Sequence, residues 1–484
     1  MIRTGEEYRE SLRDGRAVWI DGEKVEDVTA HPAFKPIVDA RARIYDLAHE
    51  QDTREVMSYV DSDTGERCPV GPKRPLTKQD WREKRAAVDR VLDDLGGIVT
   101  RVGDETVGEM WSLYDGQEVL NEIDPSFSEH IRAHVRHAEL ADPFHVSANT
   151  DPKGDRSRHP QEQDPDVLLH VAGETDGGII VRGAKFETAA AYANQAFVKP
   201  TIGDWGDTKL SDYAVGFVVD MGAPGIRHIC RSSFAERPAS DYPLATRFDE
   251  IDTMIVFDDV EIPWEDVLFY RHTAAAAFIR ATLHRYSMFP FVQRHLRFAD
   301  LLVGIAYVNA VQSGIKMHQA VREKLAELAC YREGINAHLT AAIEMGEVSP
   351  GGLLMPNQAL LYTGRVLACT QLPAMMHLAR DLCGGQLCVL PSAETFADPE
   401  AGPWLDKYLA VGDVSAEERR RLFAFARDLL NSDYAGHRLT FQLFAQSPAF
   451  AHLLAVYNNY EFDGPADLVR RYAGLERPLT ATRA

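Results

Sequence analysis

The sequence predicts an α+β protein with a helical N-terminal domain, a small antiparallel β domain and a C-terminal helical bundle. Helical periodicity dominates the first ~140 residues, short β-type runs separated by turns fill residues 166–264, and long apolar helical stretches follow. The chain has 484 residues, which is too long for one compact core. We therefore expect domains at residues 1–141, 142–272 and 273–484.

The N-terminal domain is expected to consist of helices joined by polar loops. Apolar residues recur at helical spacing in four stretches, which are Ile37–Glu50, Lys78–Leu95, Thr106–Leu113 and Pro125–Leu140. The last stretch opens with proline, which is a common first residue of a helix.

The middle block has the short period of β-strands. The runs VLLHV and IIVRGAKF flank the turn sequence GETDGG, and this order predicts a strand, a turn and a second strand. Three further runs, YAVGFVVDM, GIRHICR and MIVFDDVEI, are separated by turns that contain glycine or proline. Hairpins of this kind predict an antiparallel sheet.

The C-terminal part is helical again. Three stretches carry the pattern, Ala274–Met345, Leu360–Leu382 and Glu417–Phe444. Gly304 and Gly314 predict breaks or close contacts within the first stretch, and Pro373 predicts a kink in the second. Several of these helices are apolar on more than one face, which favours a bundle completed by another subunit.

Composition and charge exclude several classes of partner. The formal net charge of −21 argues against nucleic acid and against an anionic membrane surface. The polar N-terminus and the lack of any apolar run of about 18 residues predict neither a secretory signal nor a membrane span. Six scattered cysteines form no CxxC pair, so we expect reduced thiols and a cytoplasmic protein.

Several nucleotide-binding and hydrolytic motifs are absent. The chain contains no GxGxxG after a strand, no GxxxxGK[ST], no HExxH and no GxSxG. A nicotinamide-binding domain is therefore not expected, and any redox chemistry would need electrons from another protein.

Long motifs in the same order resemble one enzyme family. The opening TGEEYRESLRDGRAVWIDGEKVEDVTAHPAF, the segment RGAKFETA, the segment PLATRFDEIDTMIVFDDVEIPWEDVLFY and the segment LPSAETFADPEAGPWLDKYL resemble the large, oxygenase component of 4-hydroxyphenylacetate 3-monooxygenases. The resemblance extends from about residue 3 to residue 460 and so covers nearly the whole chain.

The resemblance implies a fold, a reaction and partners. The fold would be that of the acyl-CoA dehydrogenase-like flavoproteins, and the chain would form a homotetramer or homodimer. Members of the family take reduced FAD (FADH2) from a separate NAD(P)H:flavin reductase and form a flavin C4a-hydroperoxide with O2. This species hydroxylates an electron-rich aromatic or heteroaromatic small molecule while the protein excludes water and orients the ring.

Two residues are expected to be catalytic. His145 in DPFHVSANTDPKGDR matches a family histidine that faces both flavin and substrate, and an imidazole can hydrogen-bond the oxygen donor or help to ionise a phenol. Arg101 in VTRVGDETV matches an arginine near the substrate, where a guanidinium would stabilise a phenolate or hold a carboxylate.

Glu105 departs from the family pattern. The family has a tyrosine at this position, four residues after the arginine, and that tyrosine helps to hold the phenol. An ionised carboxylate donates no hydrogen bond and repels a phenolate. We hypothesise that the substrate is not 4-hydroxyphenylacetate and that it carries an NH or a cationic group. The alternative is a local shift of the alignment, with Glu105 on the surface.

The resemblance also assigns binding residues. Thr201 and Ile202 match a pair on the substrate side, together with Arg101, Glu105 and His145. The expected flavin contacts are His145, Asn149, Lys153, Gly154, Asp155, Arg156, Thr188, Ala445, Gln446, Ser447 and Pro448. Glycine in the DPKGDR loop would let backbone amides approach the pyrophosphate.

No metal site is expected, and two other functions stay open. His130, His134 and His137 share one side of a predicted helix, but no clear further ligand is nearby. A 4-hydroxybutyryl-CoA dehydratase has the same fold and flavin, but it needs cluster cysteines that are missing around residues 97–105 and 284–300. A flavin-binding paralogue without catalytic activity is the second alternative.

Overall fold

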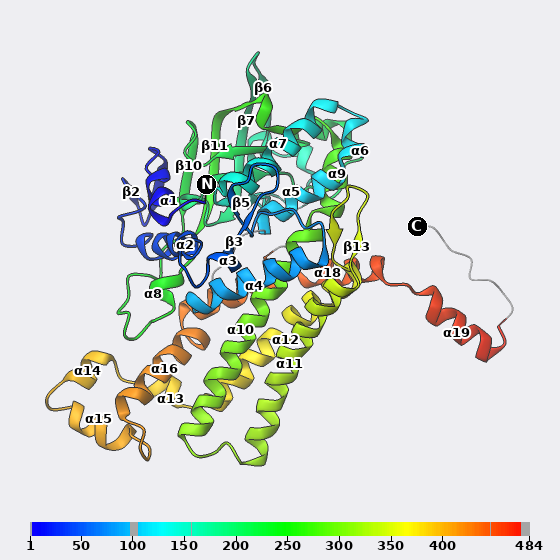
Figure 1. The fold of residues 1–484 in the computed structure, drawn as a ribbon. Helices are drawn as coiled ribbons and strands as arrows, with labels where there is room; N and C mark the ends of the chain where they lie inside the picture. Colours follow the sequence, from blue (N-terminus) through cyan, green and yellow to red (C-terminus); the bar gives the residue numbers. More distant parts are fainter. Residues whose placement is uncertain (1, 97–104, 156, 446, 476–484) are drawn as a thin grey trace.

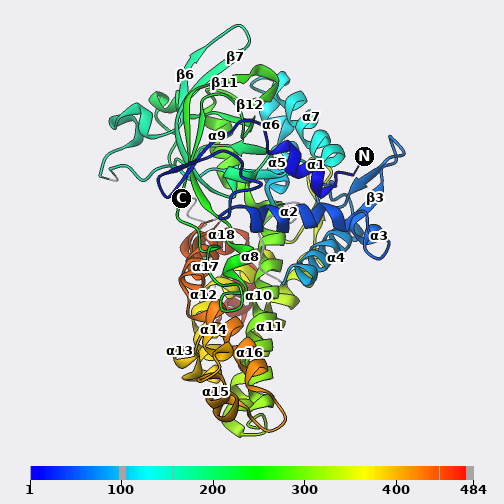
Figure 2. The ribbon, with the colours of Figure 1, turned by 90° about the vertical axis from the view of Figure 1, so that its left-hand side faces the viewer.

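A computed structural model describes residues 2–96, 105–155, 157–445 and 447–475. The β-strands and N-terminal helices form one end of the molecule, and the long C-terminal helices form the other (Figure 1; Figure 2). The α–β–α order that the sequence predicts is confirmed.

The N-terminal part contains short strands as well as helices. Its elements are α1 (Gly5–Ser11), β1 (Ala17–Ile20), β2 (Glu23–Val25), α2 (Lys35–Leu47), α3 (Arg54–Met57), β3 (Ser58–Val60), β4 (Arg67–Pro69), α4 (Lys78–Asp94), α5 (Glu105–Asp115), α6 (Gln117–Asn121) and α7 (Pro125–Ala141). The four predicted helices correspond to α2, α4, α5 and α7. Helix α4 begins with a capping box, in which Thr77 and Asp80 satisfy each other's backbone N–H groups.

The middle part contains most of the strands. Its elements are β5 (His145–Ala148), β6 (His170–Glu174), β7 (Gly178–Thr188), β8 (Gln195–Val198), β9 (Gly216–Asp220), β10 (Ile226–Cys230), α8 (Ala245–Phe248), β11 (Asp252–Pro263) and β12 (Val267–Phe269).

These strands form two sheets rather than one. The orders are β2-β1-β10-β11-β7-β6 and β12-β9-β8-β5. The consecutive strands β6 and β7 form an antiparallel hairpin, as expected, and β11 also pairs with β7 in antiparallel fashion. In contrast, β1 pairs with β10 and β5 with β8 in parallel. Parallel pairs join strands that are distant in sequence, so local hairpin signals do not reveal them. The N-terminal β1 and β2 thereby extend a sheet of the middle part.

The C-terminal part is almost entirely helical. Its elements are α9 (Thr273–Thr282), α10 (His284–Gln312), α11 (Gln319–Glu344), β13 (Glu347–Val348), β14 (Leu354–Met355), α12 (Gln358–Cys383), α13 (Gln386–Val389), α14 (Ala393–Ala397), α15 (Gly402–Leu409), α16 (Ala416–Leu430), α17 (Asp433–Phe444), α18 (Ala449–Asn459) and α19 (Asp463–Ala473).

Glycine and serine decide where these helices end. Gly314 has a φ of +71° and follows α10, whereas Gly304 lies inside α10 without a break. The single stretch predicted from Glu417 to Phe444 is two helices, because Ser432 caps the start of α17 through the backbone N–H of Ala435.

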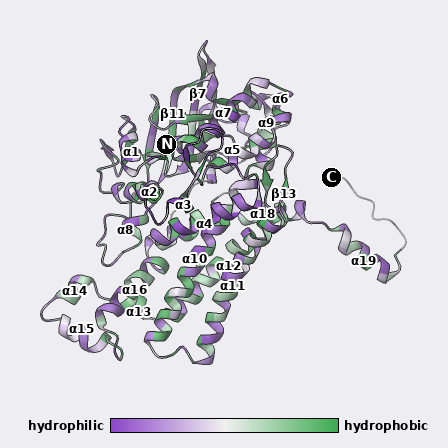
Figure 3. Cartoon of the chain, viewed as in Figure 1, coloured by the Kyte–Doolittle hydropathy of each residue, from purple (hydrophilic) through white to green (hydrophobic). Residues whose placement is uncertain are grey.

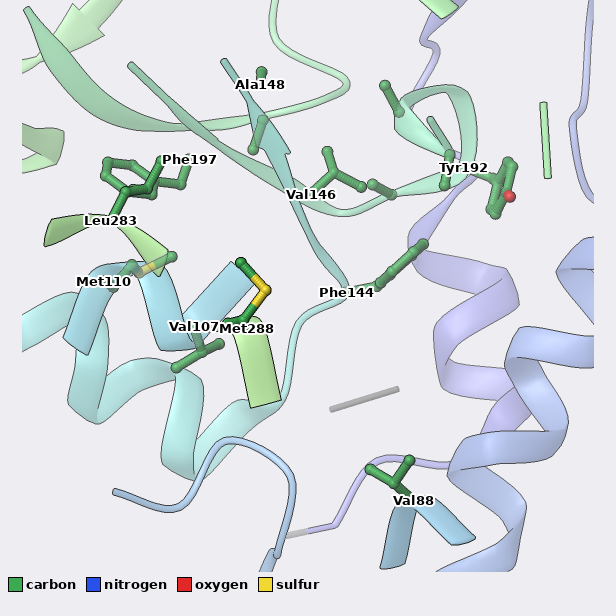
Figure 4. Packing of buried hydrophobic residues seen from close by; sticks show 14 of the residues in the cluster. Val88, Val107, Met110, Phe144, Val146, Ala148, Tyr192, Phe197, Leu283 and Met288 are labelled. Carbon is green, nitrogen blue, oxygen red and sulfur yellow. The ribbon is translucent and has the colours of Figure 1, made fainter. Parts of the chain in front are cut away.

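A buried core fixes α5 against β5 and α10. Val107 on α5 lies near Met288 on α10, Met110 lies beside Leu283, and Val146 of β5 belongs to the same core (Figure 4). Because the strand alternates, Val146 and Ala148 point away from the side on which His145 and Ser147 lie. The polar residues of α5 and β5 are therefore held by apolar packing on the opposite side.

Candidate functional site

A cleft of about 890 Å³ lies where the β layer meets the helical bundle. Residues of α5, β5, β7 and β11 line one part of it. Residues of α10 and α17, with the segment that precedes α18, line the rest. The cleft thus joins parts of the chain that are about 300 residues apart in sequence, which only the tertiary fold can bring together.

The cleft gathers many of the residues that the sequence predicts. The predicted residues in its lining are Glu105, Asn149, Lys153, Thr188, Thr201, Ala445, Ser447 and Pro448. The predicted residues outside its lining are His145, Gly154, Asp155 and Ile202. Arg101, Arg156 and Gln446 lie outside the described residues.

His145 lies behind the cleft. Its side chain lines a separate cavity of about 70 Å³, and Thr106 lines both this cavity and the cleft. The Thr106 hydroxyl donates a hydrogen bond to the backbone carbonyl of His145 at 3.2 Å. Burial, with a smaller contribution from His134 and His137, lowers the pKa of His145 to about 3. The imidazole is therefore neutral at physiological pH.

Glu105 is buried in an ion pair. The Arg294 guanidinium donates through Nη1 to Glu105 Oε1 at 2.6 Å, and the two residues are 2% and 9% exposed. Glu105 is the first residue of α5, where the positive end of the helix favours a carboxylate. The alternative of a surface position for Glu105 does not agree with this burial.

A second buried charge pair borders the cleft. Lys199 Nζ donates to Glu109 Oε2 at 2.6 Å and to Ser147 Oγ at 2.7 Å. Ser147 in turn donates to the same Glu109 oxygen at 2.5 Å. Glu109 lies one helical turn after Glu105, so both carboxylates of α5 face the cleft.

A third charged group joins the β layer to α17. His437 Nε2 contacts Asp252, and Thr188 donates to the other Asp252 oxygen. Arg231 forms an ion pair with Asp252 at 3.1 Å. Although burial opposes ionisation, the His437, Arg231 and Thr188 contacts hold the pKa of Asp252 below its usual range. The other imidazole nitrogen of His437 is buried and has no hydrogen-bond partner within the described part of the chain.

The DPKGDR loop is fixed to the substrate-side threonine. Asp151 accepts a hydrogen bond from the Thr201 hydroxyl at 2.7 Å and pairs with buried Lys185. Gly154 has a φ of +55°, which favours glycine, and Asp155 donates its backbone N–H to Gln163 at 2.8 Å. Lys153 is the residue of this loop that reaches the cleft.

The junction of α17 and α18 is held by a buried arginine. Arg365 of α12 donates to the carbonyl of Ala445 at 2.8 Å and to that of Gln442 at 3.1 Å. Burial lowers the pKa of Arg365 to about 9. These bonds place Ala445, Ser447 and Pro448 at the cleft.

The three histidines of α7 have other partners. His130 Nδ1 is 2.8 Å from the Val267 carbonyl oxygen, and His134 Nε2 is 3.1 Å from Asp266. Among the described residues, no group of three or more His, Cys, Asp or Glu side chains is arranged to hold a metal ion.

Sequence reasoning missed several residues of the cleft. These are Thr106, Glu109, Ser147, Thr150, Phe186, Glu187, Asp252, Phe291, Arg294, His437, Thr440, Phe441 and Phe444. Arg294 and His437 lie in stretches that the sequence analysis treated as bundle helices. A charged residue within an apolar helix was the available signal, because such a group needs a buried partner.

The fold and the cleft agree with a class of flavoproteins that are built from helical and β layers. Comparison with known proteins identifies the family. The model for the N-terminal domain of 4-hydroxyphenylacetate 3-hydroxylase matches residues 4–269, and that for the C-terminal domain matches residues 273–474. The chain belongs to the 4-hydroxyphenylacetate 3-hydroxylase family. The enzyme class predicted from the sequence, a reduced-flavin-dependent aromatic monooxygenase, is confirmed.

Relatives match over nearly their full length. The oxygenase component of 4-hydroxyphenylacetate 3-monooxygenase from Thermus thermophilus is 29% identical, with 98% of this chain and 97% of that protein covered. The oxygenase component of a 4-nitrophenol 4-monooxygenase/4-nitrocatechol 2-monooxygenase from Rhodococcus opacus is 30% identical, with 98% and 91% covered.

Solved structures agree with the fold. A crystal structure of the oxygenase component (HpaB) of 4-hydroxyphenylacetate 3-monooxygenase complexed with FAD has a TM-score of 0.90 and 29% identity, covering 97% of this chain and 98% of that one. An archaeal 4-hydroxybutyryl-CoA dehydratase from N. maritimus also has a TM-score of 0.90, with 25% identity and coverage of 99% and 96%. The fold alone does not separate these two activities.

Proposed function

We propose that this chain is the oxygenase component of a two-component monooxygenase that uses reduced FAD and O2 to hydroxylate a small aromatic or heteroaromatic molecule. The observation that carries this proposal is the cleft. Its lining combines predicted flavin contacts from the β layer and the α17–α18 junction with the aromatic and charged residues of α5, α10 and α17.

The residues present fit a flavin. Lys153 offers a positive charge from the DPKGDR loop, and Asn149, Thr188 and Ser447 offer hydrogen-bonding groups along the cleft. The unpaired nitrogen of His437 is a further group for a polar ligand. When bound, reduced FAD would supply the electrons that activate O2, and the oxygen atom transferred to the substrate would come from O2.

The protein would orient the aromatic ring of the substrate and influence the protonation of its polar group. Phe291 and Phe441 offer apolar ring faces in the lining of the cleft. His145 is neutral, so it is in the form that accepts a proton, and it lies beyond Thr106, which also borders the cleft. Bulk water would have to be excluded from the reacting centre when the flavin and the substrate are bound.

We further propose that the substrate is not 4-hydroxyphenylacetate. Glu105 replaces the tyrosine expected to hold the phenol, and its carboxylate is engaged with Arg294. The hypothesis of a substrate with an NH or cationic group assumed that Glu105 was available to receive it. The ion pair with Arg294 removes that reason. Glu105 and Arg294 together therefore determine which polar group of a substrate this part of the cleft prefers.

We also propose three features of the cellular context. A separate NAD(P)H:flavin reductase would supply the reduced flavin. A cytoplasmic location is supported by the six cysteines, all of which are free thiols. A homotetramer or homodimer is supported by the exposed apolar residues of α18 and α19, which include Phe450, Tyr457 and Tyr472.

A turnover screen tests the function. The chain, a generic NAD(P)H:flavin reductase, FAD and a panel of phenols and heteroaromatics are incubated in air, and products are analysed by mass. We expect addition of one oxygen atom to some members, with no product when the chain or the reductase is omitted. Efficient conversion of 4-hydroxyphenylacetate to the catechol would contradict the proposal about the substrate.

Two further outcomes distinguish the alternatives. Oxygen consumption without any oxygenated product, for every member of the panel, would favour a paralogue without catalytic activity. Dehydration of 4-hydroxybutyryl-CoA in the absence of the reductase would favour the dehydratase. The latter is not expected, because none of the six cysteines lies on α5 or in the first half of α10.

A further inference from the structure

Arg294 of α10 is a buried cation in the lining of the cleft. Its side chain is 2% exposed. One terminal nitrogen, Nη1, donates to Glu105 at 2.6 Å. The other two nitrogens, Nε and Nη2, are buried and have no hydrogen-bond partner among the residues that the structure describes.

The two unpaired nitrogens form one edge of the guanidinium. In arginine the N–H bonds of Nε and Nη2 are parallel and lie on the same side, which is the geometry that matches two oxygens of an oxyanion. A buried charged donor without a partner is unfavourable. This edge is therefore prepared for a ligand that supplies oxygen acceptors.

The surroundings of Arg294 favour an aromatic anion. The guanidinium carbon lies 4.2 Å from the centre of the Phe291 ring and 5.5 Å from that of Phe441, and both rings line the cleft. Arg365 lies 3.8 Å from the same Phe291 ring. The rings can pack against an aromatic ligand while the guanidinium groups give the region a positive charge.

Charged groups from several elements act on Arg294. Burial lowers the pKa of Arg294, and Arg438 of α17 also lowers it, whereas Glu105 of α5 and Glu250, which precedes β11, favour its charged form. Glu250 is itself paired with Arg438 at 3.0 Å. The carboxylate of Glu105 thus balances Arg294 without occupying its Nε–Nη2 edge.

We propose that Arg294 determines substrate specificity by binding an oxyanion of the aromatic substrate, either a phenolate or a carboxylate, through Nε and Nη2. Glu105 is a positioning residue that orients the guanidinium. This inference rests on the proposed function, because it takes the cleft to be the substrate site.

The ionisation state of bound 4-nitrophenol tests the proposal. The phenolate form absorbs visible light differently from the phenol, so difference spectra against the same protein without probe report ionisation. The full chain is saturated with oxidised FAD and kept free of reductant, so that no turnover occurs. We expect the apparent pKa of bound 4-nitrophenol to lie about 1 to 3 below that of the free compound.

Variants separate a specific role from a structural one. Arg294→Met is expected to abolish the lowered pKa, and Arg294→Lys to retain much of it because the charge remains. Glu105→Ala is expected to move the pKa back toward the free value, and Glu105→Gln to restore it through its side-chain oxygen. Arg297→Met is the matched control, because Arg297 lies on the same helix and pairs with Asp93 outside the cleft.

A second pair of probes identifies the source of the oxyanion. Benzoate and its neutral isostere benzamide are titrated into the same protein by calorimetry. Tighter binding of benzoate, lost in Arg294→Met, assigns the edge to a carboxylate, while an effect confined to 4-nitrophenol assigns it to a phenolate.

Three outcomes would overturn the proposal. The first is a wild-type protein with no preference for anionic probes. The second is an Arg294→Met protein that folds and keeps the lowered pKa. The third is a variant that loses FAD affinity while probe binding is unchanged, since the edge would then serve the flavin. A failed turnover screen leaves these binding results intact, so the two proposals fail separately.

Discussion

Buried charges at the cleft differ in how completely they are paired. Glu109 has both Lys199 and Ser147 as partners, whereas two nitrogens of Arg294 and one of His437 have no partner among the described residues. Fully paired groups fix the geometry of α5 and β5, because the loss of either partner leaves a charge uncompensated. Groups with unpaired atoms are those that a ligand can satisfy.

His145 predicts how stability depends on pH. Its pKa is about 3 in the folded chain and 6.5 in the unfolded chain, so below pH 6.5 only the unfolded chain gains this proton. The contribution of His145 is therefore fully present above pH 6.5 and is lost as pH falls toward 3. When the pH falls from about 7 to about 5, the free energy of unfolding of the wild type should decrease by about 2 kcal/mol more than that of His145→Gln.

Urea unfolding at the two pH values measures this difference. His318→Gln, which changes an exposed imidazole that precedes α11, is the control and should behave as the wild type does. Equal losses in His145→Gln and the wild type would show that the imidazole is not buried in its neutral form.

Helices α5 and α10 approach closely at one glycine. A Cβ atom at Gly108 would lie 3.0 Å from the backbone nitrogen of Ser287 and 3.2 Å from its Cα. Both atoms belong to the backbone, so α5 would have to move away from α10. Because Glu105 and Glu109 lie on α5, such a movement would also disturb the cleft.

Alanine at this position is expected to destabilise the protein. Gly108→Ala should lower the free energy of unfolding by about 1 to 3 kcal/mol through overpacking. Gly304→Ala on α10 is the matched control, since no atom lies within 4 Å of its Cβ position. That substitution should stabilise the helix by up to about 1 kcal/mol. Equal and favourable effects of both substitutions would contradict the close approach of the helices.

At the scale of the whole molecule, the C-terminal helices leave apolar residues uncovered. Helix α19 projects away from the rest of the chain, and both apolar and polar residues are visible along it (Figure 3). On α18 the exposed apolar side chains are Phe450, Leu453, Leu454 and Tyr457. A surface of this kind is typical of a contact with another protein.

The same region is apolar enough to be compared with a membrane span. The stretch Asp433–Asn459 is as long and as apolar as a membrane-spanning helix, and 12% of its most apolar segment is buried in the protein. The described residues form two helices in it, of 12 and 11 residues, whose junction borders the cleft. A span needs about 20 continuous residues, so neither helix is long enough.

Charges on α18 are expected to prevent assembly. The double substitution Leu453→Glu and Tyr457→Glu should produce a smaller species in light scattering, because two carboxylates would be buried at the contact. FAD should also bind more weakly, since α18 begins at the edge of the cleft. Val60→Glu, at an exposed apolar residue of β3, is the control. An unchanged mass of the double variant would contradict the proposed contact.

Local patterns in the sequence determined much of this protein. Helical periodicity located α2, α4, α5 and α7 to within a few residues. Turn residues located the hairpin of β6 and β7, because the glycine-rich turn GETDGG joins these two consecutive strands. Ordered family motifs determined the enzyme class. The same motifs assigned Thr188 and Ser447 to one flavin site, and both residues line the cleft.

Only the tertiary structure decided what depends on distant contacts. The parallel pairing of β1 with β10 and the pairing of Glu105 with Arg294 join residues that are far apart in the chain. No local pattern encodes such a partner, because side-chain pairing depends on the three-dimensional packing of whole elements. Glu105 looked like a lone acceptor in the sequence, and the fold makes it half of a buried ion pair at the cleft.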